Sequence, residues 1–137
     1  MEILLENYST TIAIEAAAAL DMFHKDILPS ISAYTGDLTK AALAKKAAGI
    51  SAGFEAELAD KLSKLSAAMY TAGVKLAKDL KAAETIADSH QKATFFYEKV
   101  LADMTELRAA VDAAEALAGG KYLPYPTYGE LLFGVNE

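Results

Sequence analysis

The sequence predicts an all-α fold: an up-down-up bundle of three long helices, one short extra helix and an extended aromatic C-terminal tail. Alanine, the strongest helix former, supplies 29 of the 137 residues. Along three stretches the apolar residues recur at steps of three and four, which places them on one face of a helix. No recurrent alternation of β-branched and polar residues indicates a sheet. The length suits a single helical domain, residues 1–137, with its own core.

The first helix is expected from about Leu5 to Tyr34. Pro29 interrupts its pattern, and because proline lacks a backbone donor we expect a kink or break near Asp26 to Pro29. Gly36 then reads as the glycine that ends the helix. The shared apolar face holds Tyr8, Ile12, Ala16, Ala19, Phe23, Ile27 and Ile31.

The short extra helix is expected from about Leu38 to Ala48. Lys45 and Lys46 lie in its last turn, where positive charge favours the negative end of the helix dipole. Gly49 and Ser51 separate it from the next helix, and Ser51 is the expected N-cap of that helix.

The central helix, from Phe54 to Leu80, organises the predicted bundle and is about 40 Å long. Gly73 lies inside it and predicts a close contact with another backbone. Five lysines lie off the apolar face and are expected to be solvated: Lys61, Lys64, Lys75, Lys78 and Lys81. The apolar face comprises Phe54, Leu58, Leu62, Leu65, Met69, Ala72, Leu76 and Leu80.

The last long helix is expected from about Lys92 to Ala118, with Asp88 or Ser89 as a cap before it and Gly119 after it. Short connections between three long helices predict up-down-up packing with crossing angles of about 20°. The apolar face of this helix comprises Phe96, Val100, Met104, Leu107, Val111 and Ala114.

The tail, residues 121–137, differs in composition from the helices. It contains three tyrosines, a phenylalanine, three leucines and two of the three prolines of the chain. Because the prolines hold it extended, we expect a strap packed on the bundle. The alternative is that part of the tail docks on another chain or domain.

Composition excludes several classes of function. The net charge is −6 and Arg108 is the only arginine, which disfavours nucleic-acid binding. No apolar run approaches the roughly 18 residues that span a bilayer, and the acidic N-terminus is unlike a signal peptide. The chain has no cysteine, so thiol chemistry and disulfides are excluded. We therefore expect a cytoplasmic protein without nucleic-acid or membrane partners.

The sequence predicts no catalytic, cofactor-binding or metal-binding residue in this chain. His24 and His90 are the only histidines, and Asp21 with His24 has a spacing that can chelate a metal. A di-iron bundle, however, needs two Glu-x-x-His pairs and two further carboxylates. His24 followed by Lys25 fits a phosphotransfer bundle loosely, and Gly119-Gly120 lacks the Lys-Ser/Thr of a phosphate-binding loop.

Two stretches together carry a family resemblance. The first is Ile3-Leu-Leu-Glu-Asn-Tyr8, continuing through Thr11-Ile-Ala-Ile-Glu-Ala16 to Asp26-Ile-Leu-Pro29, and the second is Leu123-Pro-Tyr-Pro-Thr-Tyr-Gly-Glu-Leu-Leu-Phe133. In this order they resemble the C-terminal region of type III glutamine synthetases, the large bacterial form of that enzyme. The resemblance covers nearly the whole chain, and the tail is its more specific half.

The resemblance implies that the chain is a C-terminal fragment of an ATP-dependent glutamate–ammonia ligase. The parent would make glutamine from glutamate and ammonia with ATP and Mg²⁺ or Mn²⁺, at motifs that lie upstream of this region. The fragment alone would then be inactive and would have a scaffold or assembly role. Its partners would be its own catalytic domain and the neighbouring subunits of a ring-shaped homo-oligomer. Regulatory docking ranks second among its roles.

A stand-alone helical adaptor, either an interaction module or a phosphotransfer-like bundle, is the alternative from another class. The start of the chain discriminates weakly between the two. Met1 is followed directly by the helix-forming Glu2–Glu6 segment without a preceding cap residue, which favours a cut from a longer chain.

Overall fold

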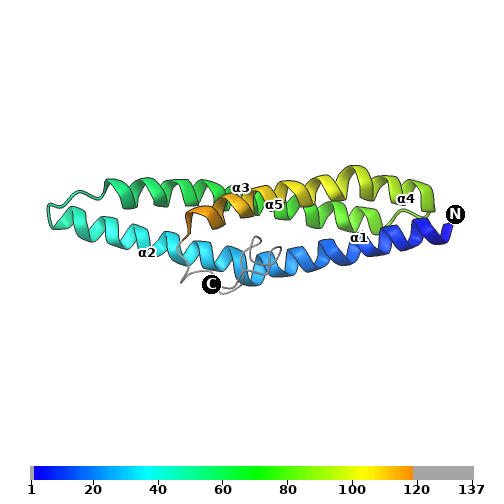
Figure 1. Cartoon of the computed structure of the whole chain (residues 1–137), viewed down its shortest axis with the longest axis horizontal. Helices are drawn as coiled ribbons and strands as arrows, with labels where there is room; N and C mark the ends of the chain where they lie inside the picture. Colours follow the sequence, from blue (N-terminus) through cyan, green and yellow to red (C-terminus); the bar gives the residue numbers. More distant parts are fainter. Residues whose placement is uncertain (1, 119–137) are drawn as a thin grey trace.

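The structure, a computed structural model, describes residues 2–118 and is helical throughout that range apart from two connections. The helices form three long rods (Figure 1). The first rod comprises α1 (Glu2–Met22), the π-helical η1 (Phe23–Ile27) and α2 (Leu28–Ala47); the second is α3 (Gly53–Glu84); the third comprises α4 (Ser89–Phe95), the π-helical η2 (Phe96–Val100) and α5 (Leu101–Leu117). The predicted all-α class is therefore confirmed, and the described residues contain no strand.

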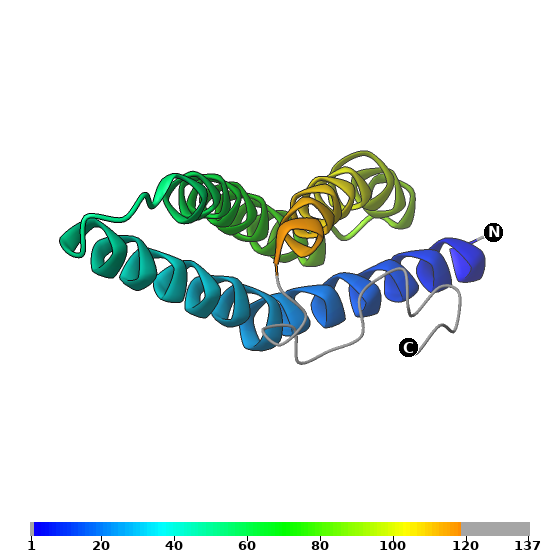
Figure 2. The same cartoon turned by 60° about the vertical axis from the view of Figure 1, so that its left-hand side comes forward.

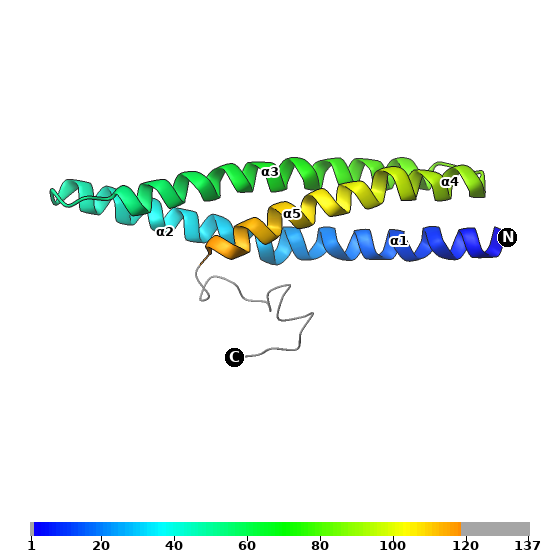
Figure 3. The same cartoon turned by 45° about the horizontal axis from the view of Figure 1, so that its top comes forward.

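The rods differ in length, and this sets the shape of the molecule. The first rod runs from the N-terminus to the loop before α3, a length of about 70 Å. In Figures 2 and 3, α5 ends part-way along α2, while α2 and α3 continue beyond it as a helical hairpin. The main packing contacts join α2 to α3, α3 to α5 and α1 to α4. The crossing angles remain a prediction, and the tail lies outside the described residues.

The first rod corrects two expectations. The chain does not break at Pro29, and no separate helix covers Leu38 to Ala48; both belong to α2, which also contains Gly36. The cause is the π turn before Pro29, where the Leu28 N–H donates to the Phe23 carbonyl and widens the helix. This widening relieves the clash that a proline ring makes with the preceding turn of an α-helix.

Side-chain hydroxyls supplement the backbone bonds of this rod. The Ser30 hydroxyl donates to the Asp26 carbonyl at 2.6 Å, next to the proline. Thr35 and Thr39 donate to the carbonyls four residues before them, each at 2.8 Å. Gly36 therefore lies in an intact stretch of helix.

The π turn also keeps the apolar residues of the first rod in line. Phe23, Ile27 and Ile31 are spaced by fours, and each step of four carries a side chain about 40° around an α-helix. A π turn holds more residues, so it absorbs this drift, and all three side chains are buried.

Capping interactions form at the helix ends of both connections, α2 to α3 and α3 to α4. Gly49 has φ +75, and the Ile50 N–H donates to the Lys45 carbonyl at 2.8 Å, which is the bonding pattern of a Schellman motif at the end of α2. The expected cap at Ser51 is wrong, because Ala52 occupies the N-cap position of α3 without a side-chain bond. The expected cap at Asp88 is confirmed: its carboxylate accepts from the Gln91 N–H at 2.9 Å.

The core follows the predicted apolar faces, with Phe54 as the exception. Phe54 is 71% exposed, because the first turn of α3 lies at the end of the hairpin, beyond α5. The five lysines expected to be solvated are exposed. The buried apolar residues are Ile12, Ala16, Phe23, Ile27, Ile31, Leu38, Leu62, Met69, Ala72, Leu76, Ala83, Ala93, Phe96, Val100, Leu107 and Ala114.

Candidate functional site

A close contact between the first rod and α3 lies at Gly73. A Cβ atom at this position would lie 2.8 Å from Cε2 of Phe23, which is 1% exposed at the start of η1. A close contact was predicted at Gly73, and the structure identifies the partner as an aromatic ring instead of a backbone. The missing side chain therefore lets the π segment of the first rod pack directly on α3.

A charged cluster that contains one buried carboxylate joins α3 to α5. Asp103 on α5 is only 2% exposed, although its neighbours on the helix surface are solvated. The Lys75 Nζ on α3 lies 3.5 Å from Oδ1 of Asp103 and 3.6 Å from Oε2 of Glu106. The apolar pattern of the last helix passes over Asp103, and no sequence signal identified it as a core residue.

The environment of Asp103 favours its neutral form. The pKa of Asp103 is raised from 3.8 to about 6, chiefly by burial and also by Asp79, which acts as a hydrogen-bond acceptor and as a nearby negative charge. Lys75 opposes these effects but does not cancel them. The Oδ2 atom of Asp103 is buried without a hydrogen-bond partner, so a negative charge on it would be poorly stabilised. This also favours the protonated form of the carboxyl group.

A second ion pair clasps the hairpin formed by α2 and α3. Lys45 in the last turn of α2 pairs with Glu55 in the first turn of α3. Glu55 is 8% exposed, and the hydrogen bond from Lys45 is the main reason that its pKa lies below the usual range. This pair holds the two helices together at the end where no third helix covers them.

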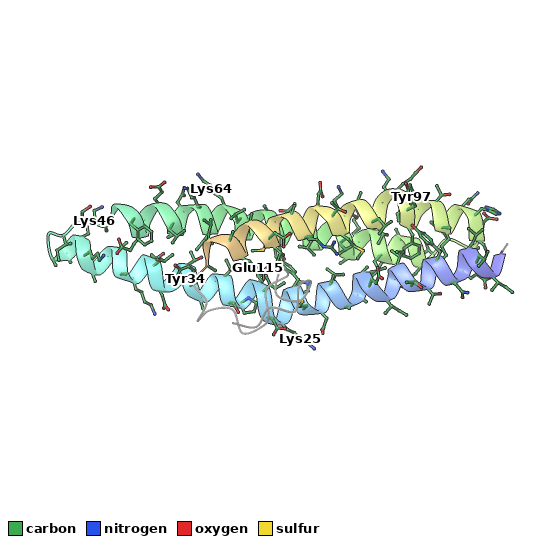
Figure 4. The ribbon with its side chains drawn as sticks, in the orientation of Figure 1. Lys25, Tyr34, Lys46, Lys64, Tyr97 and Glu115 are labelled. Carbon is green, nitrogen blue, oxygen red and sulfur yellow. The ribbon has the colours of Figure 1, made fainter. Side chains whose placement is uncertain are left out.

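The end of the hairpin presents apolar surface to solvent. We call this surface the hairpin tip and define it by Leu43, Ile50 and Phe54, which are 65%, 59% and 71% exposed. A groove of about 550 Å³ runs along it, and Lys46 gives the groove its positive charge. The small side chains of Ala42, Ala56 and Ala59 line the groove. Figure 4 shows Lys46 at this end of the molecule.

The residues considered for metal or phosphate chemistry lie apart. The Asp21 carboxylate pairs with Lys25 at 3.0 Å, and Figure 4 shows Lys25 on the outside of the rod. His24 is exposed with its ring 5.1 Å from that of Phe23, and His90 is exposed in the first turn of α4. Within residues 2–118, no three His, Cys, Asp or Glu side chains come together in a way that could hold a metal. None of the helices in that range has the length and apolarity to cross a membrane.

Comparison with known proteins bears on identity. A family model described as the glutamine synthetase C-terminal domain matches this chain over residues 1–46. This part of the chain matches the glutamine synthetase C-terminal domain. A glutamine synthetase from Butyrivibrio fibrisolvens is 44% identical over 137 residues, covering 98% of this chain and 20% of the relative. The chain therefore spans about a fifth of the length of the relative it matches.

The two findings confirm the predicted resemblance at the level of the glutamine synthetase C-terminal domain. The family model covers α1, η1 and nearly all of α2, which is the long rod of the structure. The similarity to the relative covers 98% of this chain and so extends beyond the first rod to α3 and α5.

Proposed function

We propose that this chain is the non-catalytic C-terminal helical domain of a type III glutamine synthetase and that it serves as a scaffold for assembly. The supporting observation is the 44% identity to a glutamine synthetase along almost the whole chain. The parent enzyme would act in the cytoplasm, make glutamine from glutamate and ammonia, and use ATP with Mg²⁺ or Mn²⁺ at sites outside this chain.

The described residues suit a scaffold in two respects. A rod of about 70 Å gives a long surface to a chain of modest size. Charged groups on different helices lie close together, as Lys75 does with Asp103 and Lys45 with Glu55, so polar contacts as well as the core connect the helices. The proposed partners are the catalytic domain of the same enzyme and the neighbouring subunits of a ring-forming homo-oligomer.

The role is tested by deletion from the parent enzyme. The enzyme would be purified with and without this region, and its mass would be measured by light scattering together with its glutamine synthetase activity. We expect the truncated enzyme to assemble incompletely or to unfold at lower temperature. A truncated enzyme with the full mass, stability and activity of the parent would refute the scaffold role.

A helical interaction module is the second candidate, and the exposed hairpin tip favours it. Three large apolar side chains at one end are typical of surfaces that meet another protein segment. In that case the truncated enzyme, which lacks this region, would assemble normally but lose its response to a regulator. The same purified proteins therefore separate the two candidates.

A further inference from the structure

The helical hairpin reaches past the end of α5, and within residues 2–118 no third helix covers its tip. α5 runs toward the α2–α3 loop and ends at Leu117, part-way along α2 (Figures 1 and 3). Beyond that point α2 packs on α3, and the main contacts of α5 are with α3. Leu43, Ile50 and Phe54 consequently remain more than half exposed.

The chain that follows α5 has the chemistry to cover this tip. Residues 119–137 contain large apolar side chains throughout, namely Tyr122, Leu123, Tyr125, Tyr128, Leu131, Leu132 and Phe133. Pro124 and Pro126 restrict their backbone to extended conformations, which suits a segment lying in a groove. Glu130 also supplies a charge opposite to that of Lys46 in the groove.

The reach is sufficient. The whole of α2, Leu28–Ala47, is about 30 Å long, and the part beyond the end of α5 is shorter than that. An extended chain advances about 3.3 Å per residue, so residues 119–137 can cover roughly 60 Å. The segment can therefore arrive at the hairpin tip from the end of α5 with length to spare.

We propose that residues 121–133 of the same chain dock on the hairpin tip and fill the groove lined by Leu43 and Ile50. Docking of this segment would remove the apolar side chains of the hairpin tip from water, as α5 does at the other end of the hairpin. This proposal concerns the chain alone and does not depend on the glutamine synthetase assignment.

Cross-linking between introduced cysteines tests the proposal, because the natural chain has no cysteine. The test variant carries Ile50→Cys and Tyr128→Cys, and the control carries Tyr97→Cys and Tyr128→Cys. Tyr97 is 68% exposed on η2 and lies toward the other end of the molecule, about 30 Å back along the helix from Leu117 (Figure 4). Both variants would be treated with a short bismaleimide at low protein concentration.

The test variant is expected to cross-link within one chain about tenfold faster than the control, because docking raises the local concentration of the two thiols. Equal rates in the two variants would overturn the proposal. Cross-linking between chains would overturn it as well and would identify a second copy as the occupant of the groove. Circular dichroism verifies that both variants fold, and the pair Phe54→Cys with Phe133→Cys repeats the test at an independent position.

Discussion

The middle of the first rod and its end at the α2–α3 loop are helical in the same way but pack differently. At η1, Phe23 is buried, and its ring lies so close to Gly73 of α3 that a methyl group on Gly73 would not fit. Around the α2–α3 loop, an ion pair between Lys45 and Glu55 joins the helices while Phe54 faces solvent. The comparison indicates that the packed half determines the stability of this chain, whereas the hairpin end provides surface for contact.

The largest expected effect on stability comes from removing a buried side chain from the packed half. Phe23→Ala removes a fully buried ring and should lower the free energy of unfolding by about 3–5 kcal/mol, measured by urea denaturation. Phe54→Ala is the matched control, and its effect should stay within about 0.5 kcal/mol because the ring is exposed. Similar losses in the two variants would break the comparison.

The next effect concerns the contact at Gly73. Gly73→Ala gains about 1 kcal/mol of helix propensity, but overpacking against the buried ring costs about 1–3 kcal/mol, so a net destabilisation of about 1 kcal/mol is expected. Gly36→Ala has nothing within 4 Å of the new methyl group and should instead stabilise the protein, by about 0.5–1 kcal/mol. Thermal unfolding of both variants measures the two signs, and a stabilising Gly73→Ala would contradict the close packing.

Asp103 makes the stability of the packed half depend on pH. Since its pKa is raised from 3.8 to about 6 in the folded protein, the folded state binds the proton more tightly than the unfolded state. The contribution is complete below pH 4 and is lost as the pH rises through 6.

Asp103→Asn should therefore be more stable than the natural protein at pH 7. One pKa unit corresponds to about 1.4 kcal/mol, and because water reaches the half-exposed Lys75 we discount the shift to a gain of about 1 kcal/mol. The gain should vanish below pH 4. Asp60→Asn, which alters a surface pair with Lys64, should show no such pH dependence. A loss of stability at pH 7 that vanishes below pH 4 would contradict this and would show that the carboxylate is needed as the ion-pair partner of Lys75.

The smallest expected effect is at the clasp of the hairpin. Lys45→Ala leaves Glu55 without its ion-pair partner and should speed amide hydrogen exchange around the α2–α3 loop. Exchange in the middle of α3 should not change, because that region is held by the core around Phe23. Lys61→Ala, at an exposed pair with Glu57, is the control. Faster exchange throughout the chain would mean that the clasp supports the whole fold.

Periodicity was sufficient to predict the helices and most of their buried residues. It did not predict the continuity of the first rod, because Pro29 and Gly36 are local stop signals and the π turn that accommodates the proline is a three-dimensional solution. Asp103 escaped notice for a similar reason: a carboxylate within a polar-looking turn becomes a core residue only through the approach of α3. Phe54 illustrates the converse, since an apolar face does not reveal where its partner helix ends.

The assignment to a parent enzyme depends on sequence similarity, whereas the distinction between the packed half and the hairpin end depends on the structure. The match to a glutamine synthetase covers 98% of this chain and so spans both the packed half and the hairpin. The described residues contain no cluster that could hold a metal, and the chemistry proposed for the parent is assigned to other parts of it.

The most direct test of the account is the size and activity of the natural protein that carries this sequence. An antibody raised against the chain would capture that protein from a lysate of the source organism, for blotting and for assay with glutamate, ammonia and ATP. The account predicts a single band at about five times the 14.5 kDa of this chain, as the 20% coverage of the relative implies, together with glutamine formation. A band at 14.5 kDa without ligase activity would contradict it and would identify a small helical protein that is made alone.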